Sequence, residues 1–276
     1  MSETTFIRDI ASSHVRGIQQ FPDKADAEKF IDELFRFLFI NSGKRNNGQH
    51  PDEKYQQLKS EFESLLSVSL EKNDDVEKHS STFFNALPYI YQELLKDAEA
   101  ILKFDPAAHN LAEVIIAYPG FYATVVYRLS HQIWQQGIQL LPRLFSGYAH
   151  SKTGIDIHPA AHIGEAFAID HGTGIVIGET TRIGNYVKIY QGVTLGALNV
   201  IKSEASSKRH PTIEDEVVIY SGATILGGET VIGKGSIIGG NVWLTYSVPS
   251  NSVVYHKSEI RIKDKNPFPE PINFII

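Results

Sequence analysis

The 276-residue chain contains no cysteine. This absence excludes disulfide bonds, zinc sites built from thiolates and a cysteine nucleophile. Positively charged residues are outnumbered: the chain has 26 lysines and arginines and 32 aspartates and glutamates, which gives a net charge of -6. Nucleic-acid-binding domains generally carry a basic surplus, so we expect no nucleic-acid partner and favour a small molecule or another protein.

Long apolar runs are missing as well. The most apolar stretch, 114–127, is interrupted by Pro119-Gly120 and is too short to cross a bilayer. The first ten residues, MSETTFIRDI, lack the basic and apolar segments of a signal peptide. We therefore expect a soluble, cytoplasmic protein without membrane association, with enough apolar residues (42%) to build one large or two ordinary domains.

The dominant pattern is a six-residue repeat. Helices repeat near ~3.6 residues and strands at 2, so a fixed longer period indicates a solenoid whose coils bury a continuous core. The repeat predicts a left-handed parallel β-helix, with one apolar residue of each hexad pointing inward. Its inward positions are Ile157, Ile163, Ile169, Ile177, Ile183, Ile189, Leu195, Ile213, Ile219, Ile225, Ile232, Ile238 and Leu244.

The repeat breaks its register once within its first half. The step from Ile169 to Ile177 is eight residues instead of six. Two extra residues should therefore bulge from the solenoid beside Asp170 and His171. Solenoids often carry their functional features where they depart from the repeat, so we look for chemistry here.

The chain before the repeat has helical spacing of apolar residues, with a break at Pro119-Gly120. Asp105 followed by Pro106 predicts the N-cap and first residue of a helix, and residues 142–150 are expected to link the helices to the solenoid. We predict an α+β protein with an all-helical domain (1–150), a β-helix catalytic domain (151–247) containing an inserted loop (197–212), and a tail (248–276).

Several motifs, in this order, resemble those of the serine acetyltransferases, hexapeptide-repeat enzymes of cysteine biosynthesis. The resemblance covers residues 105 to about 248. It implies transfer of an acetyl group from acetyl-coenzyme A to the hydroxyl of L-serine, with no metal. The motifs are DPAA (105–108), PGF (119–121), DIHPAAHIG (156–164), IDHGTGIVIGET (169–180), GVTLG (192–196), KRHP (208–211) and GATILG (222–227).

The resemblance also implies the catalytic residues. A serine hydroxyl needs a base, and an imidazole with a pKa near ~6.5 suits that task and can return the proton to the leaving thiolate. His171 is the candidate base within the full motif, whereas spacing alone favours a surface histidine at a solenoid corner. By resemblance, Asp156 is the partner that orients it: it precedes His171 by fifteen residues and so lies roughly one eighteen-residue coil below. The alternative is that Asp156 merely caps the first coil.

Substrate binding requires opposite charges for the ammonium and carboxylate of serine. By resemblance, Asp105 and Asp170 contact the serine, and Arg209 with His210 holds its carboxylate. Asp105 has a competing structural role as an N-cap, worth ~1 kcal/mol, and Arg209 could simply be a solvated charge. His158 and His162 are interpreted as structural or surface residues.

Acetyl-coenzyme A is expected in the groove between two adjacent solenoids. Gly196, Gly222 and Ala223 are small enough to admit its pantetheine arm, or are simply corner residues of the repeat. By the same resemblance, each groove needs two prisms, which implies a homotrimer; the helical domain is expected to pair trimers into a hexamer, and a trimer alone is the alternative. L-cysteine is the expected feedback inhibitor.

The chain ends in Ile276, and family members use a terminal isoleucine carboxylate to enter the active site of O-acetylserine sulfhydrylase. The alternative is a tail packed on its own trimer. Other functions left open are a hexapeptide acyltransferase for a different acceptor, a zinc carbonic anhydrase on the same solenoid, and a non-catalytic scaffold that binds the sulfhydrylase.

Overall fold

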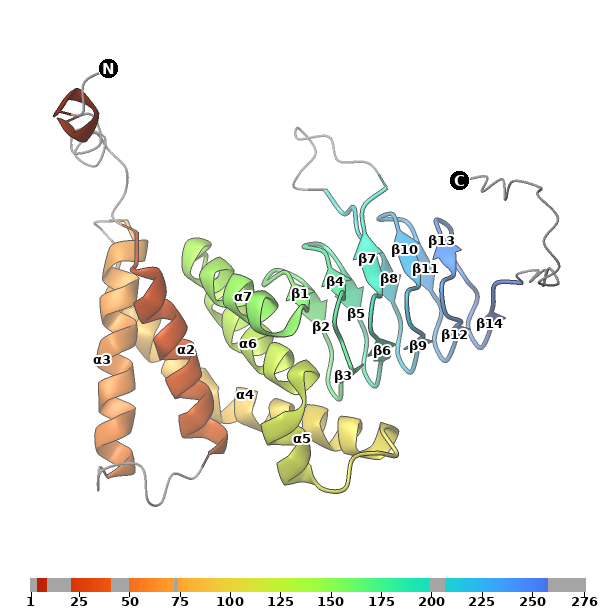
Figure 1. Cartoon of the computed structure of the whole chain (residues 1–276), viewed down its shortest axis with the longest axis horizontal. Coiled ribbons are helices and arrows are strands. Elements are labelled where there is room, and N and C mark those ends of the chain that lie inside the picture. The colour runs from red at the N-terminus through yellow and green to blue at the C-terminus, as the bar shows by residue number, and fades with distance from the viewer. Residues whose placement is uncertain (1–3, 9–20, 41–49, 72–73, 199–206, 258–276) are drawn as a thin grey trace, which may run out of the picture.

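The computed structural model describes residues 4–8, 21–40, 50–71, 74–198 and 207–257. A cluster of helices leads directly into a β-solenoid that extends away from it (Figure 1). The α+β architecture predicted from the sequence is confirmed: helices come first and a left-handed parallel β-helix of hexapeptide repeats follows.

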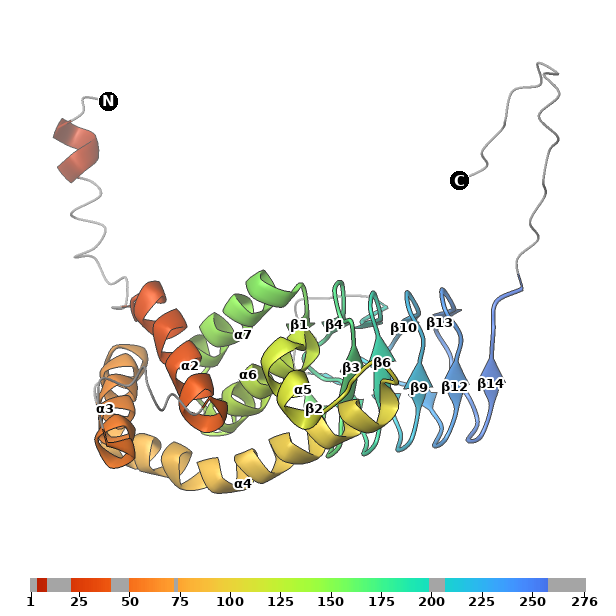
Figure 2. The ribbon, with the colours of Figure 1, turned by 60° about the horizontal axis from the view of Figure 1, so that its bottom comes forward.

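The helical part runs from α2 to α7. Its helices are α2 (Lys24–Phe39), α3 (Pro51–Ser69), α4 (Val76–Phe104), α5 (Leu111–Ala117), α6 (Pro119–Trp134) and α7 (Leu140–Thr153). The predicted break at Pro119-Gly120 separates α5 from α6, with Pro119 at the first position of α6, where a missing N–H costs nothing. Helix α4 runs along the base of the helical cluster and reaches the solenoid (Figure 2).

Three parallel sheets form the faces of the solenoid prism. Sheet A holds β1 (Asp156–Ile157), β4 (Val176–Ile177), β7 (Thr194–Gly196), β10 (Thr224–Leu226) and β13 (Trp243–Leu244). Sheet B holds β2 (His162–Ile163), β5 (Arg182–Ile183), β8 (Thr212–Ile213) and β11 (Val231–Ile232). Sheet C holds β3 (Ala168–Asp170), β6 (Lys188–Tyr190), β9 (Val218–Ile219), β12 (Ile237–Ile238) and β14 (Val253–Val254).

The strand register confirms the predicted bulge. Asp170 pairs with Tyr190, twenty residues later, whereas Val176 pairs with Thr194, eighteen residues later. The offset falls by two between Asp170 and Val176, so two extra residues lie in the corner that joins sheet C to sheet A. The predicted apolar positions stack in columns inside the prism, as in the buried row Ile169, Ile189, Ile219 and Ile238.

Two apolar cores meet at the junction of helices and solenoid. The helical core includes Ala166 and Ala168 of the first coil, and the solenoid core includes Ala123 and Tyr127 of α6. A β-carbon on Gly120 would lie 2.8 Å from both the Cβ and the carbonyl oxygen of Ile169. Glycine is therefore required where α6 approaches β3 most closely.

Three local expectations differ from the structure. Asp105 is the C-cap of α4 and not an N-cap, because the residue before a proline is driven out of the helical region (φ -99°, ψ 109°). The next helix begins at Leu111 with Asn110 as its cap. Residues 142–150 lie inside α7, which continues to a left-handed cap at Gly154. The solenoid also extends past 248 through β14, which pairs with β12.

Candidate active site

His171 lies in the bulged corner at the end of β3. Its φ of 59° is unusual for a residue with a side chain, and Gly172 follows with a φ of 101°. A β-carbon on Gly172 would lie 2.5 Å from Cδ1 of Ile155. This backbone turns the imidazole outward, and its side chain is 76% exposed. The candidate base is thus held on a constrained turn and is open to a substrate.

Asp170 is largely buried beside this histidine, with 13% of its side chain exposed. Its Oδ1 lies 3.7 Å from Nε2 of His171, and its Oδ2 lies 3.1 Å from Nζ of Lys188. One carboxylate thus faces both a potential base and a lysine. The roles of Asp170 in binding serine and of His171 as the base stay predictions.

Helix α4 brings Asp105 to the same place. Its Oδ2 accepts a hydrogen bond from the hydroxyl of Tyr118 (2.7 Å), and its Oδ1 accepts one from the amide of Ala107 (2.8 Å). These bonds, with the charges of Lys188 and His171, hold the pKa of the Asp105 carboxyl below its ordinary value. The carboxylate in turn raises the pKa of Tyr118 to about 12. Asp105, far away in sequence, joins Asp170 in lining one small recess.

Lys188 is a site residue that the sequence analysis missed. It starts β6 directly above Ala168, and only 7% of its side chain is exposed. Its ammonium group donates to the carbonyl of Phe104 (3.2 Å) and lies 4.5 Å from the centre of the Tyr190 ring. A lysine on the outer face of a strand is usually expected to be exposed to solvent. Either count of the first coil places it near Asp170: eighteen residues would put Lys188 directly opposite Asp170, and the observed twenty pair it with Ala168, two positions away on the same face of the sheet.

Arg209 and His210 lie at a different edge of the prism, where sheet A meets sheet B. Their backbone amides donate to Oγ1 of Thr180 at 2.9 and 3.1 Å. The Arg209 guanidinium pairs with Glu179. The end of the inserted loop is thereby fastened to the corner between β4 and β5. Within one chain, the two halves of the predicted serine site are not brought together.

His210 is buried and uncharged. Its Nδ1 accepts from the amide of Thr180 (3.1 Å) and lies 2.8 Å from the hydroxyl of the same residue. Burial, followed by the charges of Arg209 and Lys208, lowers the pKa of His210 to about 4. Because Nδ1 accepts, the neutral ring carries its proton on Nε2. His210 is therefore arranged as a hydrogen-bond donor through that atom.

Asp156 is not joined to His171 by a hydrogen bond or an ion pair in the described part of the chain. It begins β1 and pairs in register with Val176, because the coil above it has twenty residues and not the assumed eighteen. Its negative charge acts instead on His158. Burial and the charge of Arg143 lower the pKa of His158 to about 4, and the charge of Asp156 opposes this shift. The role of Asp156 in orienting His171 stays a prediction.

The small residues expected to contact coenzyme A have structural explanations. Ala223 is fully buried, and its carbonyl accepts from the amide of Thr194. A β-carbon on Gly222 would lie 2.3 Å from Oδ1 of Asn241, and one on Gly196 would lie 2.9 Å from Cδ2 of Leu226. Packing within the prism accounts for their size, and their part in cofactor binding stays a prediction. Ile276 lies outside the described residues.

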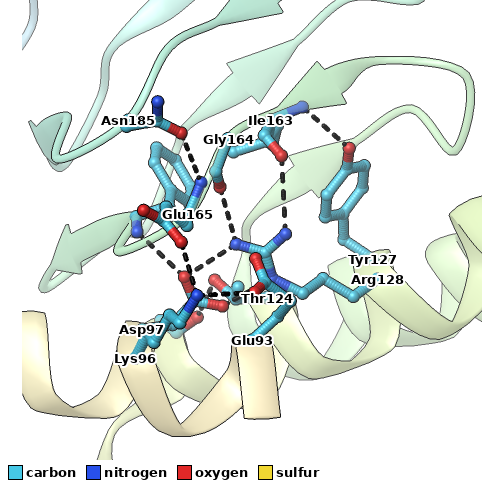
Figure 3. A network of polar contacts seen from close by, with 12 residues as sticks. Glu93, Lys96, Asp97, Thr124, Tyr127, Arg128, Ile163, Gly164, Glu165 and Asn185 are labelled. Atoms are coloured by element: carbon cyan, nitrogen blue, oxygen red, sulfur yellow. Dashed lines mark hydrogen bonds and ion pairs between the residues drawn. The ribbon is translucent and has the colours of Figure 1, made fainter. Parts of the chain in front are cut away.

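A buried ion pair between Asp97 and Arg128 fixes α4 against the first coil (Figure 3). It thereby positions Asp105, the C-cap of the same helix. Asp97, with no exposed surface, accepts from Nε (2.5 Å) and Nη2 (2.7 Å) of Arg128. Asp97 also accepts from the amide of Phe167, one residue before β3, at 2.9 Å. Arg128 also donates to the carbonyl of Gly164 (2.7 Å). The same aspartate therefore links α4, α6 and the entry to β3.

Comparison with known proteins identifies the family. No family model matches the chain. A serine acetyltransferase of Helicobacter pylori is 42% identical over 174 residues, which cover 63% of this chain and 99% of that protein. The chain belongs to the serine acetyltransferase family. A plasmid-encoded member from Synechococcus elongatus is 50% identical over 192 residues, 68% of this chain, but the match spans only 59% of that protein.

Solved structures of the family agree with the fold. A serine acetyltransferase isoform of Entamoeba histolytica in complex with cysteine superposes with a TM-score of 0.77 at 33% identity, covering 86% of this chain and 84% of that one. A Neisseria gonorrhoeae serine acetyltransferase in complex with serine gives a TM-score of 0.60 at 25% identity, covering 88% and 98%. The family suggested by the sequence motifs is confirmed.

Two structural features bear on the alternative functions and on the interpretation of the remaining histidines. No group of three or more metal-ligating side chains occurs within the described residues. In the same ranges, no helix combines the length and apolar character needed to cross a bilayer. His158 and His162, interpreted as structural, contact aromatic rings: His158 meets Trp134 edge-on at 5.1 Å, and His162 meets His131 at 5.3 Å.

Proposed function

We propose that the protein transfers the acetyl group of acetyl-coenzyme A to the hydroxyl of L-serine, giving O-acetyl-L-serine and coenzyme A, as the first step of cysteine biosynthesis. The observation that carries this proposal is the convergence of Asp105, Asp170 and His171 at the one bulged corner of the first coil. Membership of the serine acetyltransferase family supports the same reaction.

His171 acts as general base and then as general acid in this proposal. Its imidazole takes the proton of the serine hydroxyl while that oxygen attacks the thioester carbonyl carbon. When the tetrahedral intermediate collapses, the carbon–sulfur bond breaks and the imidazolium returns the proton to the leaving sulfur. Asp156 is proposed to orient the ring and stabilise its charged form.

The acceptor is held by its charged groups. The carboxylates of Asp105 and Asp170 suit the serine ammonium, and both flank His171, where the hydroxyl must lie. Arg209 and the Nε2–H of His210 suit the serine carboxylate, but they lie at another edge of the prism. A complete site therefore needs the Arg209 edge of a second copy, and this requirement supports a homotrimer.

Complementation tests this arrangement. His171→Ala and Arg209→Ala are each expected to be inactive alone. In randomly mixed trimers, about a quarter of the sites would join an intact His171 to an intact Arg209 from different copies, so activity should return to that fraction. Mixtures that stay inactive, although mixed trimers are isolated, would show that both halves must come from one chain.

Acetyl-coenzyme A is proposed to lie in the groove between copies, past Gly196, Gly222 and Ala223. The backbone groups of Ala223 are already used within the prism, since its N–H donates to Tyr220 and its carbonyl accepts from Thr194. Its contribution would be to leave room. Replacing Gly196 with valine should therefore raise the KM for acetyl-coenzyme A more than that for serine.

Further partners follow from the family and belong to this proposal. One related structure has cysteine bound and another has serine. We propose that L-cysteine inhibits this protein by occupying the serine site, that the helical domains pair trimers into a hexamer, and that the enzyme acts in the cytoplasm. Ile276 is proposed to bind O-acetylserine sulfhydrylase; deletion of this residue should abolish co-purification of the two proteins.

The acceptor panel separates this function from its rivals. L-serine should support release of the coenzyme A thiol, whereas L-homoserine and sugars should not. Release with another acceptor but not with serine would favour a different hexapeptide acyltransferase. Stoichiometric zinc with carbonic anhydrase activity would favour the zinc enzyme, and sulfhydrylase binding without any turnover would favour the scaffold.

A further inference from the structure

Lys188 occupies an unusual position for a charged side chain. It is almost fully buried, yet its pKa lies above the ordinary lysine value, because hydrogen bonds to Tyr190 and Asp170 outweigh the effect of burial. Its ammonium group touches three elements: the carbonyl of Phe104 at the C-terminal end of α4, the side chain of Asp170 on β3, and the ring of Tyr190 on its own strand. Helix carbonyl ends favour a cation.

The contact with Asp170 is specific to one oxygen. Lys188 takes Oδ2 at 3.1 Å, while Oδ1 faces Nε2 of His171 at 3.7 Å. No other hydrogen bond or ion pair holds the Asp170 side chain among the residues described. Lys188 is therefore what fixes the direction of this carboxylate and leaves its second oxygen facing the reaction centre.

The charges around the recess explain why a cation is needed. Asp105 caps α4, Asp170 ends β3, and the two carboxylates line the same recess. Other titratable groups near the pair are Tyr118 before α6, Glu113 on α5, Tyr190 on β6 and His171 at the corner. The Lys188 ammonium group, 3.1 Å from Oδ2 of Asp170, offsets the repulsion between the two like charges, and that repulsion would return if the lysine charge were removed.

We propose that Lys188 is a positioning residue of the acceptor site, keeping Asp170 ionised and fixed so that one carboxylate oxygen is left for the substrate ammonium group. This inference rests on the proposed function. In this proposal, Lys188 contacts neither the acetyl group nor the serine hydroxyl and acts only through Asp170.

The test compares how kcat/KM for L-serine depends on pH in the wild-type protein and in Lys188→Met. This substitution keeps the length of the side chain and removes its charge. In the variant, the carboxylate pair should protonate at higher pH. The value of kcat/KM for L-serine should fall to about a tenth of wild type at pH 5.5 and stay within about threefold at pH 8.5. At saturating serine, kcat should stay within about threefold at every pH, because kcat/KM reports the free enzyme and kcat reports the complex.

Two variants serve as controls. Lys188→Arg keeps the charge and should retain the wild-type profile. Lys152→Met removes a lysine that pairs with Asp32 (2.8 Å) in the helical domain, and it should lower thermal stability without changing the shape of the profile. If Lys188→Met does not fold, Lys188→Gln, which still donates to the Phe104 carbonyl, provides the same comparison.

The outcomes are distinguishable. A Lys188→Met profile parallel to that of wild type would overturn the proposal, as would an equal loss at all pH values with a matching rise in the KM for acetyl-coenzyme A, which indicates a structural role only. Failure of the proposed function appears separately, as a wild-type protein that releases no coenzyme A in response to L-serine.

Discussion

Replacing Asp97 with alanine should destabilise the protein severely, because Asp97 holds together three elements that the site depends on. The change leaves the Arg128 guanidinium, whose side chain is 10% exposed, without its carboxylate, and it leaves the Phe167 amide without an acceptor. Removing one partner of a buried ion pair costs about 3–5 kcal/mol.

That cost converts to a measurable change in melting temperature. For domains of this size, each kcal/mol corresponds to roughly 2–4 °C, so Asp97→Ala should lower Tm by about 6–20 °C. Circular dichroism or differential scanning fluorimetry on the full-length protein would report it. Arg128 retains its bond to the Gly164 carbonyl (2.7 Å), which does not neutralise its charge.

A neighbouring ion pair provides the matched control. Lys96, one residue before Asp97, pairs with Glu165 (2.5 Å) and Glu93 (3.0 Å) but has 46% of its side chain exposed. Exposed ion pairs contribute little to stability, so Lys96→Ala should lower Tm far less than Asp97→Ala does. The double variant Asp97→Ala/Arg128→Met should recover part of the loss. Equal shifts for Asp97→Ala and Lys96→Ala would refute this reasoning.

Three more predictions concern packing, positioning and pH. Gly120→Ala should cost about 1–3 kcal/mol by forcing α6 away from Ile169, whereas Gly147→Ala in α7, with nothing within 4 Å of the added carbon, should leave Tm unchanged or higher. Thr180→Val, which removes the hydroxyl that accepts from two backbone amides, should raise the KM for L-serine, and Thr180→Ser should restore it. The folded-state pKa of His210, about 4, lies below the ordinary value of 6.5, so its contribution to stability is complete above pH 6.5 and is lost as pH falls towards 4. His210→Asn, which keeps an acceptor for the Thr180 amide, should flatten the decline of Tm across that window, and an unchanged decline would contradict the assignment.

The solenoid could be predicted from the sequence because its signal is local and repeated. Each hexad places one apolar side chain inward, so counting alone located the columns and the two-residue bulge beside Asp170. Asp156 was placed with an assumed coil of eighteen residues where the bulge makes twenty, and its role in orienting His171 stays a prediction. Lys188 was missed for a different reason, because a lysine on a strand is expected to be solvated and its burial here depends on contact with Phe104 at the end of α4.

The rest of the site depends on tertiary contacts that no local pattern encodes. Asp105 was expected to start a helix; it ends one, because Pro106 forces its backbone out of the helical region. Its approach to Asp170 is set by the burial of Asp97 and Arg128 between helix and coil. Only the resemblance of its motif to the family, and not its helical signal, placed Asp105 in the site.

The most direct test of the central claim is coenzyme A thiol release from acetyl-coenzyme A by the purified full-length protein, with and without L-serine, beside His171→Ala. The account predicts release that depends on serine and falls by about 10²–10⁴ in the variant. Near-normal turnover in His171→Ala would contradict the assignment of the base, and no serine-dependent release by the wild-type protein would contradict the proposed reaction itself.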